Sequence, residues 1–377
     1  KMPKWGGLQN LKKPDECFSD HSDLIRPKIY QYRQKALRST KPYSSEELDK
    51  PVAFWSKPDR LRDKVGRELT IILRTRGCKW ALSESGGCSM CGYLQDAATT
   101  DVATHKIQNQ FDYALDQKLE EIKTASEDFV LKIFNSGSFF DESEVPPAAR
   151  QHIYERINSI PEIKEVIVES RPEFLSPPLL ADMKDALDRK TTEIGIGVET
   201  VNDYIRVNYI NKGFLFEDFK KAYELCREYE VGVKAYLLFK PAFMNEQGAI
   251  DDCVASIKTL VDMKMPSISV NPMNIQKGSL VEYLWYQHRY RPPWYYSLFK
   301  VFRRALSQEA LNTTRILCDP SGAGSKRGIH NCRRRECNES MREILEEFIL
   351  SQNLEALERE PLKCACRQQY VLKYAFL

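Results

Sequence analysis

Short apolar runs recur along the chain, separated by segments in which apolar residues return every three to four positions. The runs are rich in β-branched and aromatic side chains, which is typical of buried parallel strands. The segments between them have the spacing of amphipathic helices. The predicted strands are "ELTIILRT" at 68–75, "FVLKIFNSG" at 129–137, "EVIVESR" at 165–171, "TEIGIGVE" at 192–199, "GVKAYLLF" at 232–239 and "SISVNPMN" at 267–274. The predicted helices span residues 107–125, 215–230 and 247–263.

Six alternations of strand and helix predict an α/β fold with a partial (β/α)6 barrel or a parallel sheet. After about residue 275 the pattern changes to a segment rich in Pro, Arg and Cys. A chain of 377 residues can hold more than one domain. We therefore predict a basic N-terminal extension over 1–60, a barrel over 61–285, and a basic, Cys-rich accessory domain for RNA and zinc over 286–377.

The chain has eleven cysteines, and the role expected for them depends on the cellular compartment that the sequence predicts. No apolar run approaches the roughly 20 residues that span a bilayer. The first residues lack the apolar core of a signal peptide, so we expect a cytoplasmic protein without a membrane partner. A reducing compartment disfavours structural disulfides. Clustered cysteines are then expected to bind metal or to take part in chemistry.

Three of these cysteines, Cys78, Cys88 and Cys91, follow the first predicted strand. In a β/α barrel the chemistry is located at the carboxyl ends of the strands. Three thiolates can hold three irons of a [4Fe–4S] cluster and leave one iron open to a substrate or cofactor. The position and the spacing together favour such a cluster.

Glycines accompany the three cysteines and allow the backbone to wrap closely around a cluster. They are Gly86, Gly87 and Gly92. The alternative is a zinc site with three thiolates, completed by a residue such as His105.

A second set of metal-binding residue types lies near the C-terminus. Cys332 and Cys337, with Cys364 and Cys366, can give two ligands each to one tetrahedral zinc. Cys318 or His330 can replace one of them, and the alternative is a set of unligated thiols. The remaining cysteines are expected to have no such role: Cys226 and Cys253 in helical core positions, and Cys17 standing alone.

The formal charge is only +3, but positive charge is concentrated in two blocks. Residues 24–45 carry six Lys or Arg and no acid, and residues 289–335 carry eleven against Glu309 and Asp319. Localised Lys and Arg displace counterions from a nucleic-acid backbone, and the interleaved aromatic residues can stack on unpaired bases. The blocks therefore predict an RNA-binding surface. The alternative is a pair of solvated basic faces with aromatic residues in the core.

The cysteine spacing after the first strand resembles that of the radical S-adenosylmethionine enzymes, in the variant found in the Elongator catalytic subunit and its relatives. From about residue 50 to the end, the longer pattern resembles the radical S-adenosylmethionine subunit of archaeosine synthase (RaSEA). The stretches that carry this resemblance are "NSGSFFDESEVP", "VIVESRPEFL", "GIGVETVND", "RPPWYYSLF" and "CDPSGAGSKRGIHNC".

The resemblance implies binding sites for S-adenosylmethionine at the strand ends. The turn after the second strand is Ser136, Gly137 and Ser138, where the superfamily usually has a Gly-Gly-Glu-like stretch that pairs with the methionyl amino group. This chain lacks the acid there, and only Asp141 and Glu142 follow. Backbone carbonyls can serve instead. The alternative is an ordinary Ser/Gly turn.

Later strand ends supply further candidates. Glu169 can accept from ribose hydroxyls, and Arg171, which follows Ser170, can bind a carboxylate. Glu199 and Lys234 complete the predicted cofactor-binding set. The alternatives are a surface ion pair for the first group, helix capping for Glu199, and plain strand alternation for Lys234.

The reaction implied by the resemblance is cleavage of S-adenosylmethionine to a 5′-deoxyadenosyl radical, with an external electron donor. A partner enzyme attaches lysine to a cyano-deazaguanine in tRNA. The radical enzyme then breaks the C–N bond and leaves the amidine of archaeosine, as a lyase does. Rival interpretations are another radical tRNA-modifying enzyme, such as a methylthiotransferase, and a non-enzymatic zinc-bearing RNA-binding protein.

Overall fold

The computed structural model describes residues 20–40 and 42–374, so Cys17 and Lys41 lie outside the described residues. Its centre is one eight-stranded sheet whose strands follow one another in sequence order. The first pair is antiparallel and every later pair is parallel. The strands are β1 (Ala53–Arg60), β2 (Val65–Ile72), β3 (Phe129–Phe134), β4 (Ile163–Glu169), β5 (Thr191–Glu199), β6 (Gly232–Phe239), β7 (Ser267–Pro272) and β8 (Arg315–Leu317).

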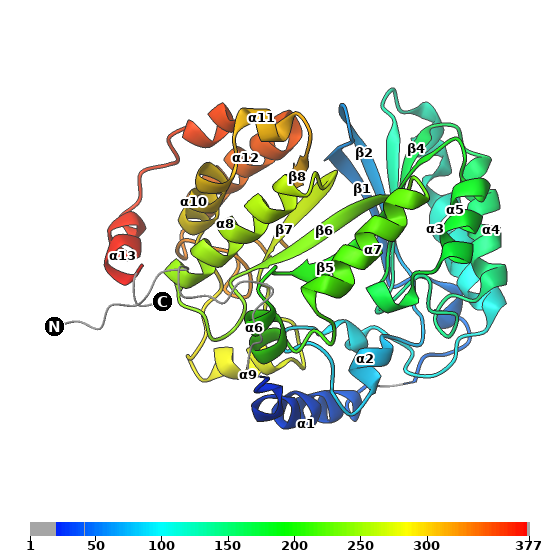
Figure 1. Cartoon of the computed structure of the whole chain (residues 1–377), viewed down its shortest axis with the longest axis horizontal. Coiled ribbons are helices and arrows are strands. Elements are labelled where there is room, and N and C mark those ends of the chain that lie inside the picture. The colour runs from blue at the N-terminus through cyan, green and yellow to red at the C-terminus, as the bar shows by residue number, and fades with distance from the viewer. Residues whose placement is uncertain (1–19, 41, 375–377) are drawn as a thin grey trace.

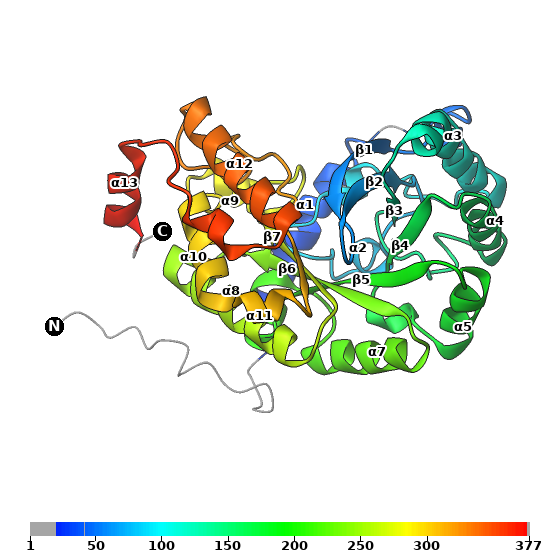
Figure 2. The same cartoon turned by 90° about the horizontal axis from the view of Figure 1, so that it is seen from above.

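Helices surround this sheet, and Figure 2 shows it curling as an open barrel with most of them on its outer side. Figure 1 shows α1, α2, α6 and α9 gathered at one end of the molecule. The helices are α1 (Arg26–Leu37), α2 (Lys79–Leu82), α3 (Thr104–Thr124), α4 (Pro147–Asn158), α5 (Pro177–Ala186), α6 (Asp203–Ile205), α7 (Phe216–Glu228), α8 (Glu246–Asp262), α9 (Leu280–Tyr286), α10 (Tyr295–Ala305), α11 (Gln308–Leu311), α12 (Arg335–Ser351) and α13 (Cys366–Lys373). Within the described chain, no helix combines the length and apolar character needed to cross a bilayer.

The six predicted strands are β2 to β7, and the predicted α/β partial barrel is confirmed. The predicted helices are α3, α7 and α8. The apolar pattern did not reveal β1 and β8. Strand β1 contains Pro58 and lies at the edge of the sheet, where a residue without an N–H is tolerated. Strand β8 has only three residues, which is too short for a recognisable run.

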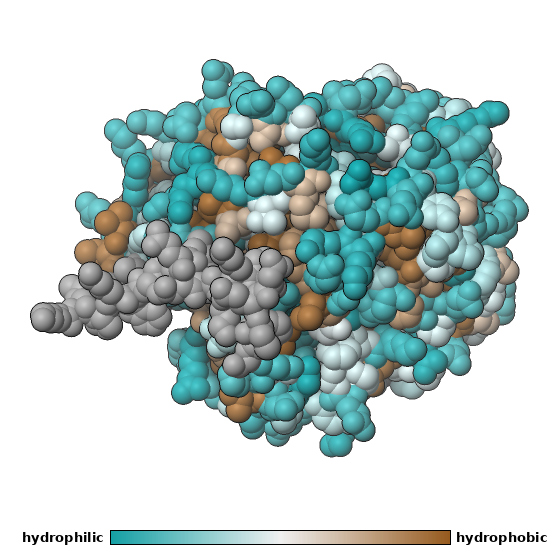
Figure 3. All heavy atoms as spheres, in the orientation of Figure 1, coloured by the Kyte–Doolittle hydropathy of each residue, from teal (hydrophilic) through white to brown (hydrophobic). Residues whose placement is uncertain are grey.

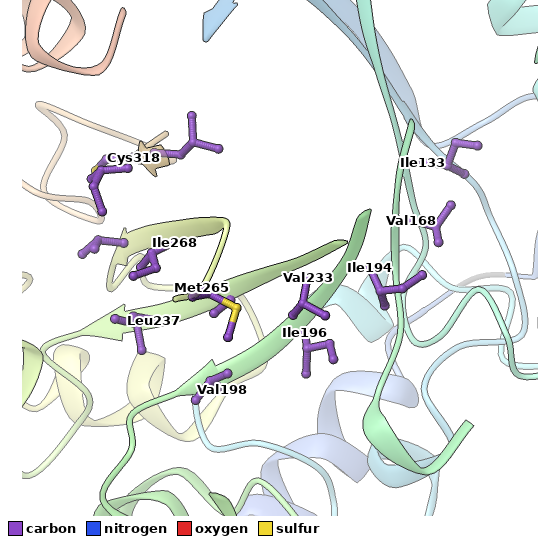
Figure 4. Close-up of a cluster of buried hydrophobic side chains, with 14 of the residues drawn as sticks. Ile133, Val168, Ile194, Ile196, Val198, Val233, Leu237, Met265, Ile268 and Cys318 are labelled. Carbon is purple, nitrogen blue, oxygen red and sulfur yellow. The ribbon is translucent and has the colours of Figure 1, made fainter. Parts of the chain in front are cut away.

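Side chains alternate between the two faces of each strand, and this alternation separates an apolar layer from a polar one. On β5, Ile194, Ile196 and Val198 are fully buried in the main hydrophobic core, and Figure 4 shows them beside residues of β4, β6 and β7. The intervening positions are Glu193, Gly195, Gly197 and Glu199, so the inner face of the curled sheet is polar. The surface seen in Figure 3 is also mainly hydrophilic, with hydrophobic residues confined to small areas.

The C-terminal part of the chain packs against the same core. Helix α10 packs on α8, and Tyr295, Phe302, Phe348 and Leu357 are buried with the strand residues. Strand β1 begins in the predicted extension and β8 lies in the predicted accessory segment. The sheet and its core therefore draw on all three predicted segments.

A buried ionic network fills the inner face. Lys132 Nζ lies 2.6 Å from Asp59 Oδ2 and also contacts Glu68. Arg315 Nη1 donates to Glu165 Oε2 at 2.7 Å, and Nη2 donates to Glu193 Oε2 at 2.8 Å. The assignment of Arg315 to an exposed basic block is therefore wrong, because acids from distant strands neutralise it inside the barrel.

Candidate functional site

The loop with three cysteines leaves β2 and crosses the carboxyl end of the sheet. Its Ser89 N–H donates to the Ile210 carbonyl at 2.8 Å, and its Gly92 N–H donates to Gln276 Oε1 at 2.5 Å. Ile210 follows β5 and Gln276 follows β7, so the loop spans the mouth of the open barrel. Cys88 is buried in an apolar cluster there, while Cys78 and Cys91 are half-buried.

Two glycines allow this loop to pack tightly. Gly86 and Gly87 have φ angles of 72° and 82°, in the left-handed region that other residues rarely adopt. A Cβ atom on Gly86 would lie 2.7 Å from the backbone of Tyr30 in α1. On Gly87 it would lie 2.8 Å from Ala81 Cα in α2. The glycines therefore bring the cysteine loop against both helices.

Two side chains that the sequence did not single out for this role brace the same loop. Arg33 of α1 donates from Nε to the Gly86 carbonyl at 3.0 Å and from Nη2 to the Cys91 carbonyl at 2.7 Å. Asn211 Nδ2 donates to the Gly87 carbonyl at 2.8 Å. Arg33 is buried, so its assignment to the RNA-binding surface is wrong.

Cationic side chains lie beside the thiols. Burial raises the pKa of Cys78, and the charge of Arg171 opposes this rise most. Burial also raises the pKa of Cys88, and there the charge of Lys212 opposes the rise most. Burial likewise raises the pKa of Cys91, and the charge of Arg33 opposes it most. One buried and two half-buried cysteines with nearby cations form a suitable environment for a cluster that carries negative charge.

The three loop cysteines and His105, the residues of the zinc alternative, do not come together in one compact group. Among the described residues, the group of side chains placed to hold a single metal ion lies in the tail, and it contains none of these four residues.

The turn after β3 contacts the cysteine loop and contains a carboxylate that the sequence analysis missed. Glu144 Oε2 accepts from Thr75 Oγ1 at 2.7 Å and from Asn135 Nδ2 at 2.8 Å, while Oε1 accepts from the Ser138 N–H at 2.9 Å. Burial raises the pKa of Glu144 to about 7. Glu144 lies six residues after Ser138, and these partners are groups of the protein itself, so it holds the turn in place.

The rest of this turn is also tightly constrained. A Cβ atom on Gly137 would lie 1.8 Å from Glu144 Oε1 and 2.8 Å from Cys78 Cα. Ser136 Oγ donates to the Tyr93 carbonyl at 3.1 Å, which joins the turn to the cysteine loop. The predicted residues Ser136, Gly137 and Ser138 thus lie beside the first cysteine.

The end of β4 is placed by contacts to both neighbouring loops. The Arg171 N–H donates to Ser138 Oγ at 3.1 Å, and Arg171 Nη1 donates to the Lys212 carbonyl at 3.0 Å. Its Nε pairs with Glu173 Oε1 at 2.5 Å, so the ion-pair alternative is present, although Arg171 itself is buried. Ser170 is buried beside it.

Glu199 ends β5 in a strained conformation. Its φ of 65° lies in the left-handed region, which costs a non-glycine residue about 1–2 kcal/mol. Its Oε1 pairs with Lys212 Nζ at 2.6 Å. The capping alternative is wrong, because Asn202 caps the following helix by accepting from the Tyr204 and Ile205 N–H groups.

Lys234 lies deeper on the inner face, in the hydrogen-bonded row that joins Glu169, Gly195 and Lys234 across β4, β5 and β6. Its Nζ lies 5.1 Å from the centre of the Tyr236 ring. Burial lowers the pKa of Lys234 to about 8 and raises that of Glu169 to about 7. Gly195 leaves room for the Glu169 and Tyr236 side chains, since an added Cβ would lie 2.7 Å from that ring.

A separate four-cysteine group forms in the tail. Cys332 Sγ lies 3.8 Å from Cys364 Sγ, and Cys337 Sγ lies 3.7 Å from Cys366 Sγ. All four sulfurs lie within 4.8 Å of one another. A tetrahedral ion with metal–sulfur bonds of about 2.3 Å requires sulfur atoms about 3.8 Å apart. This group therefore has the dimensions of a single-metal site.

The two other tail candidates lie elsewhere. Cys318 is buried in the main hydrophobic core, where Figure 4 shows it near Ile268. Burial lowers the pKa of His330 to about 4, and its Nδ1 lies 2.8 Å from the Gly328 carbonyl. Neither residue belongs to the four-cysteine group.

The chain thus forms a partial barrel of mainly parallel strands, with a three-cysteine loop across the carboxyl end of the sheet. No family model matches the chain. Among solved structures, Elp3 of Methanocaldococcus infernus has a TM-score of 0.48 and 16% identity, over 64% of this chain and 59% of that chain.

Curated relatives identify the family. An uncharacterised protein of Methanocaldococcus jannaschii is 39% identical over 92% of this chain and 92% of its own length. The archaeosine synthase subunit beta of Methanosarcina acetivorans is 37% identical over 89% of this chain and 92% of its own length. The subunit beta of Thermococcus kodakarensis is 33% identical over 86% and 98%, respectively. The chain belongs to the archaeosine synthase subunit beta family.

Replacing Glu144 tests its role in holding the turn. Glu144→Gln keeps the size of the side chain but gives the Asn135 amide and the Ser138 N–H fewer acceptors, so we expect a loss of about 1–3 kcal/mol in the free energy of unfolding. Urea denaturation measures it. Glu142→Gln is the control, because Glu142 is exposed and should change stability by less than about 0.5 kcal/mol. Equal stability of the two variants would contradict the assignment.

Proposed function

We propose that this chain is a radical S-adenosylmethionine enzyme that modifies tRNA as a subunit of archaeosine synthase. The observation that carries the proposal is the three-cysteine loop, buried beside Arg33, Arg171 and Lys212 at the carboxyl end of the sheet. Membership of the archaeosine synthase subunit beta family supports the reaction and the partner subunit.

Different residues of the site would hold the cluster and S-adenosylmethionine. Cys78, Cys88 and Cys91 would hold a [4Fe–4S] cluster, which with S-adenosylmethionine supplies an electron and a 5′-deoxyadenosyl radical. The inner carboxylates Glu169 and Glu199 can accept from ribose hydroxyls. Buried charges of both signs in this low-dielectric site orient a zwitterionic ligand strongly and exclude water from the reacting atoms.

The proposed substrate is a tRNA whose deazaguanine base carries a lysine attached through its side-chain amine. The enzyme breaks the C–N bond to the lysine carbon, and the nitrogen stays with the base as part of the amidine of archaeosine. The partner is the enzyme that attaches the lysine, and an external donor supplies electrons. The net reaction is that of a C–N lyase.

The rival interpretations have less support. A methylthiotransferase needs three more cysteines for a second cluster. Within the described chain, the other cysteines are the tail group and three residues of the hydrophobic core, Cys226, Cys253 and Cys318. A non-enzymatic RNA-binding protein has no use for the strained Glu199 or for buried carboxylates whose pKa is raised.

Replacing a loop cysteine tests the cluster. Cys88→Ala should reduce bound iron and abolish 5′-deoxyadenosine production from S-adenosylmethionine, because one of the three irons loses its protein ligand. Cys226→Ala is the matched control, since Cys226 is also buried but lies in α7, away from the loop. Anaerobic reconstitution followed by iron analysis and chromatography provides the measurement. Near-normal 5′-deoxyadenosine from Cys88→Ala would refute the proposal.

The basic surface available to bind RNA is smaller than the sequence predicted, because acids neutralise much of the second basic block. Arg303 pairs with Glu358 and Arg304 with Asp251. Three further arginines of the block also pair with carboxylates: Arg327, Arg334 and Arg335. Among the described residues, three exposed cations of the block form no ion pair: Arg289, Lys326 and Arg333. We propose that these three contact RNA phosphates.

Neutralising unpaired cations should weaken tRNA binding through lost phosphate contacts. For the double variant Lys326→Gln/Arg333→Gln, we expect the slope of log affinity against log salt to fall by roughly two, one for each contact. Arg303→Gln is the control, because Glu358 already compensates its charge, and its slope should change little. A filter-binding titration at several salt concentrations measures this. Identical slopes for all three proteins would contradict the proposed surface.

We further propose that the tail cysteines bind a structural zinc that attaches α13 to α10 and α12. Cys366 begins α13, Cys364 lies two residues before it, and Cys337 lies in α12. Cys366 Sγ lies 3.5 Å from the Tyr296 hydroxyl of α10. Burial of Trp294 beside this group adds an apolar shell. Metal binding here would contribute directly to the folding free energy of the tail.

Removing one tail thiolate should release the metal and loosen the tail. We expect Cys366→Ala to bind far less zinc than wild type and to expose residues after about 359 to protease, while the barrel keeps its cluster. The Cys226→Ala control should retain one zinc per chain. Elemental analysis and limited proteolysis give the result, and wild-type protein with its iron sites filled but well under one zinc per chain would exclude the site.

A further inference from the structure

Arg33 is a cation in the interior for which the described part of the chain provides no acidic partner. Its side chain is 1% exposed. Two of its nitrogens donate to the carbonyls of Gly86 and Cys91, at 3.0 and 2.7 Å. The third nitrogen, Nη1, is buried without a hydrogen-bond partner among the described residues. Carbonyl groups orient the guanidinium but do not neutralise its charge.

The two other cations beside the cysteine loop differ from Arg33 in this respect. Arg171 pairs with Glu173 at 2.5 Å, and Lys212 pairs with Glu199 at 2.6 Å. Each of these pairs adds no net charge to the site. A buried charge without an opposite charge nearby costs several kcal/mol. Within the described residues, the groups beside Arg33 that can carry an opposite charge are the cysteines of the loop to which it is bonded, and their thiolates with the proposed cluster would match it.

We propose that Arg33 is a positioning residue that compensates the negative charge of the cluster and raises its reduction potential. This inference rests on the cluster in the proposed function. Reduction adds one electron, so a fixed positive charge beside Cys91 stabilises the reduced form more than the oxidised form. Net charge, hydrogen bonds and solvent exposure are the main influences on such potentials. Helix α1 thus helps to set the redox chemistry as well as bracing the loop.

The test compares three variants of the full chain, reconstituted anaerobically without S-adenosylmethionine or RNA. Arg33→Gln removes the charge and keeps a hydrogen-bond donor, whereas Arg33→Lys keeps the charge. Lys35→Gln is the matched control, because it removes the same charge from an exposed position two residues further along α1. Iron analysis measures loading, and a redox titration followed by electron paramagnetic resonance measures the midpoint potential.

We expect Arg33→Gln to shift the reduction equilibrium at least tenfold towards the oxidised cluster, which is about 59 mV for a one-electron couple. Arg33→Lys should recover most of the shift, and Lys35→Gln should match wild type. A fully loaded Arg33→Gln protein with the wild-type potential would overturn the inference, and so would an Arg33→Lys potential as low as that of Arg33→Gln.

If Arg33→Gln takes up no iron, iron uptake by Arg33→Lys decides the outcome. Uptake close to that of wild type supports the inference, because lysine keeps the charge of Arg33 but cannot reproduce both hydrogen bonds to the loop. Failure of Arg33→Lys to take up iron as well shows that Arg33 is only a brace of the loop, and overturns the inference. Wild-type protein that binds no cluster would instead overturn the proposed function itself.

Discussion

Arg315 lies inside the curve of the sheet and joins strands that are far apart in sequence order. Its guanidinium binds Glu165 of β4, Glu193 of β5 and the backbone carbonyl of Arg60 at the end of β1. Lys132 of β3 joins Asp59 of β1 in the same way. Because charges in a low-dielectric interior must be matched, these bonds fix how far the open sheet curls and bring its first and last strands together.

Below the carboxyl end of the strands, Arg315 and Lys132 pair with acids inside the barrel. The candidate site at the carboxyl end of the same strands is built differently. There the loops after β2, β3, β4, β5 and β7 meet, and each contributes one or two groups rather than a complete motif. Buried carboxylates with raised pKa values, such as Glu144 and Glu169, and the strained Glu199 are concentrated in this small region. Such concentration is a common property of sites that bind and transform ligands.

Local patterns in the sequence predicted the features that depend on neighbouring residues. The six central strands, the three-cysteine loop and the pairing of the tail cysteines were all visible, because each depends on residue type at short spacing. The features that were missed depend on residues far apart. Acids such as Glu165 and Glu358 neutralise arginines that looked like an exposed basic block, and Arg33 looked like part of the first basic block although it bonds to the cysteine loop. Glu144 was missed because its partners, Thr75 and Asn135, lie on two different strand ends.

The bracing of the cysteine loop also has a consequence for how the protein is made. Arg33, Asn211 and Gln276 all bond to the backbone of residues 86–92, so the loop acquires its shape only after the ribosome has synthesised the chain beyond residue 276. Contacts of such long sequence separation form late and slowly during folding. The three cysteines are therefore held in their final places only once the barrel has closed, and the proposed cluster would meet its finished site at that stage.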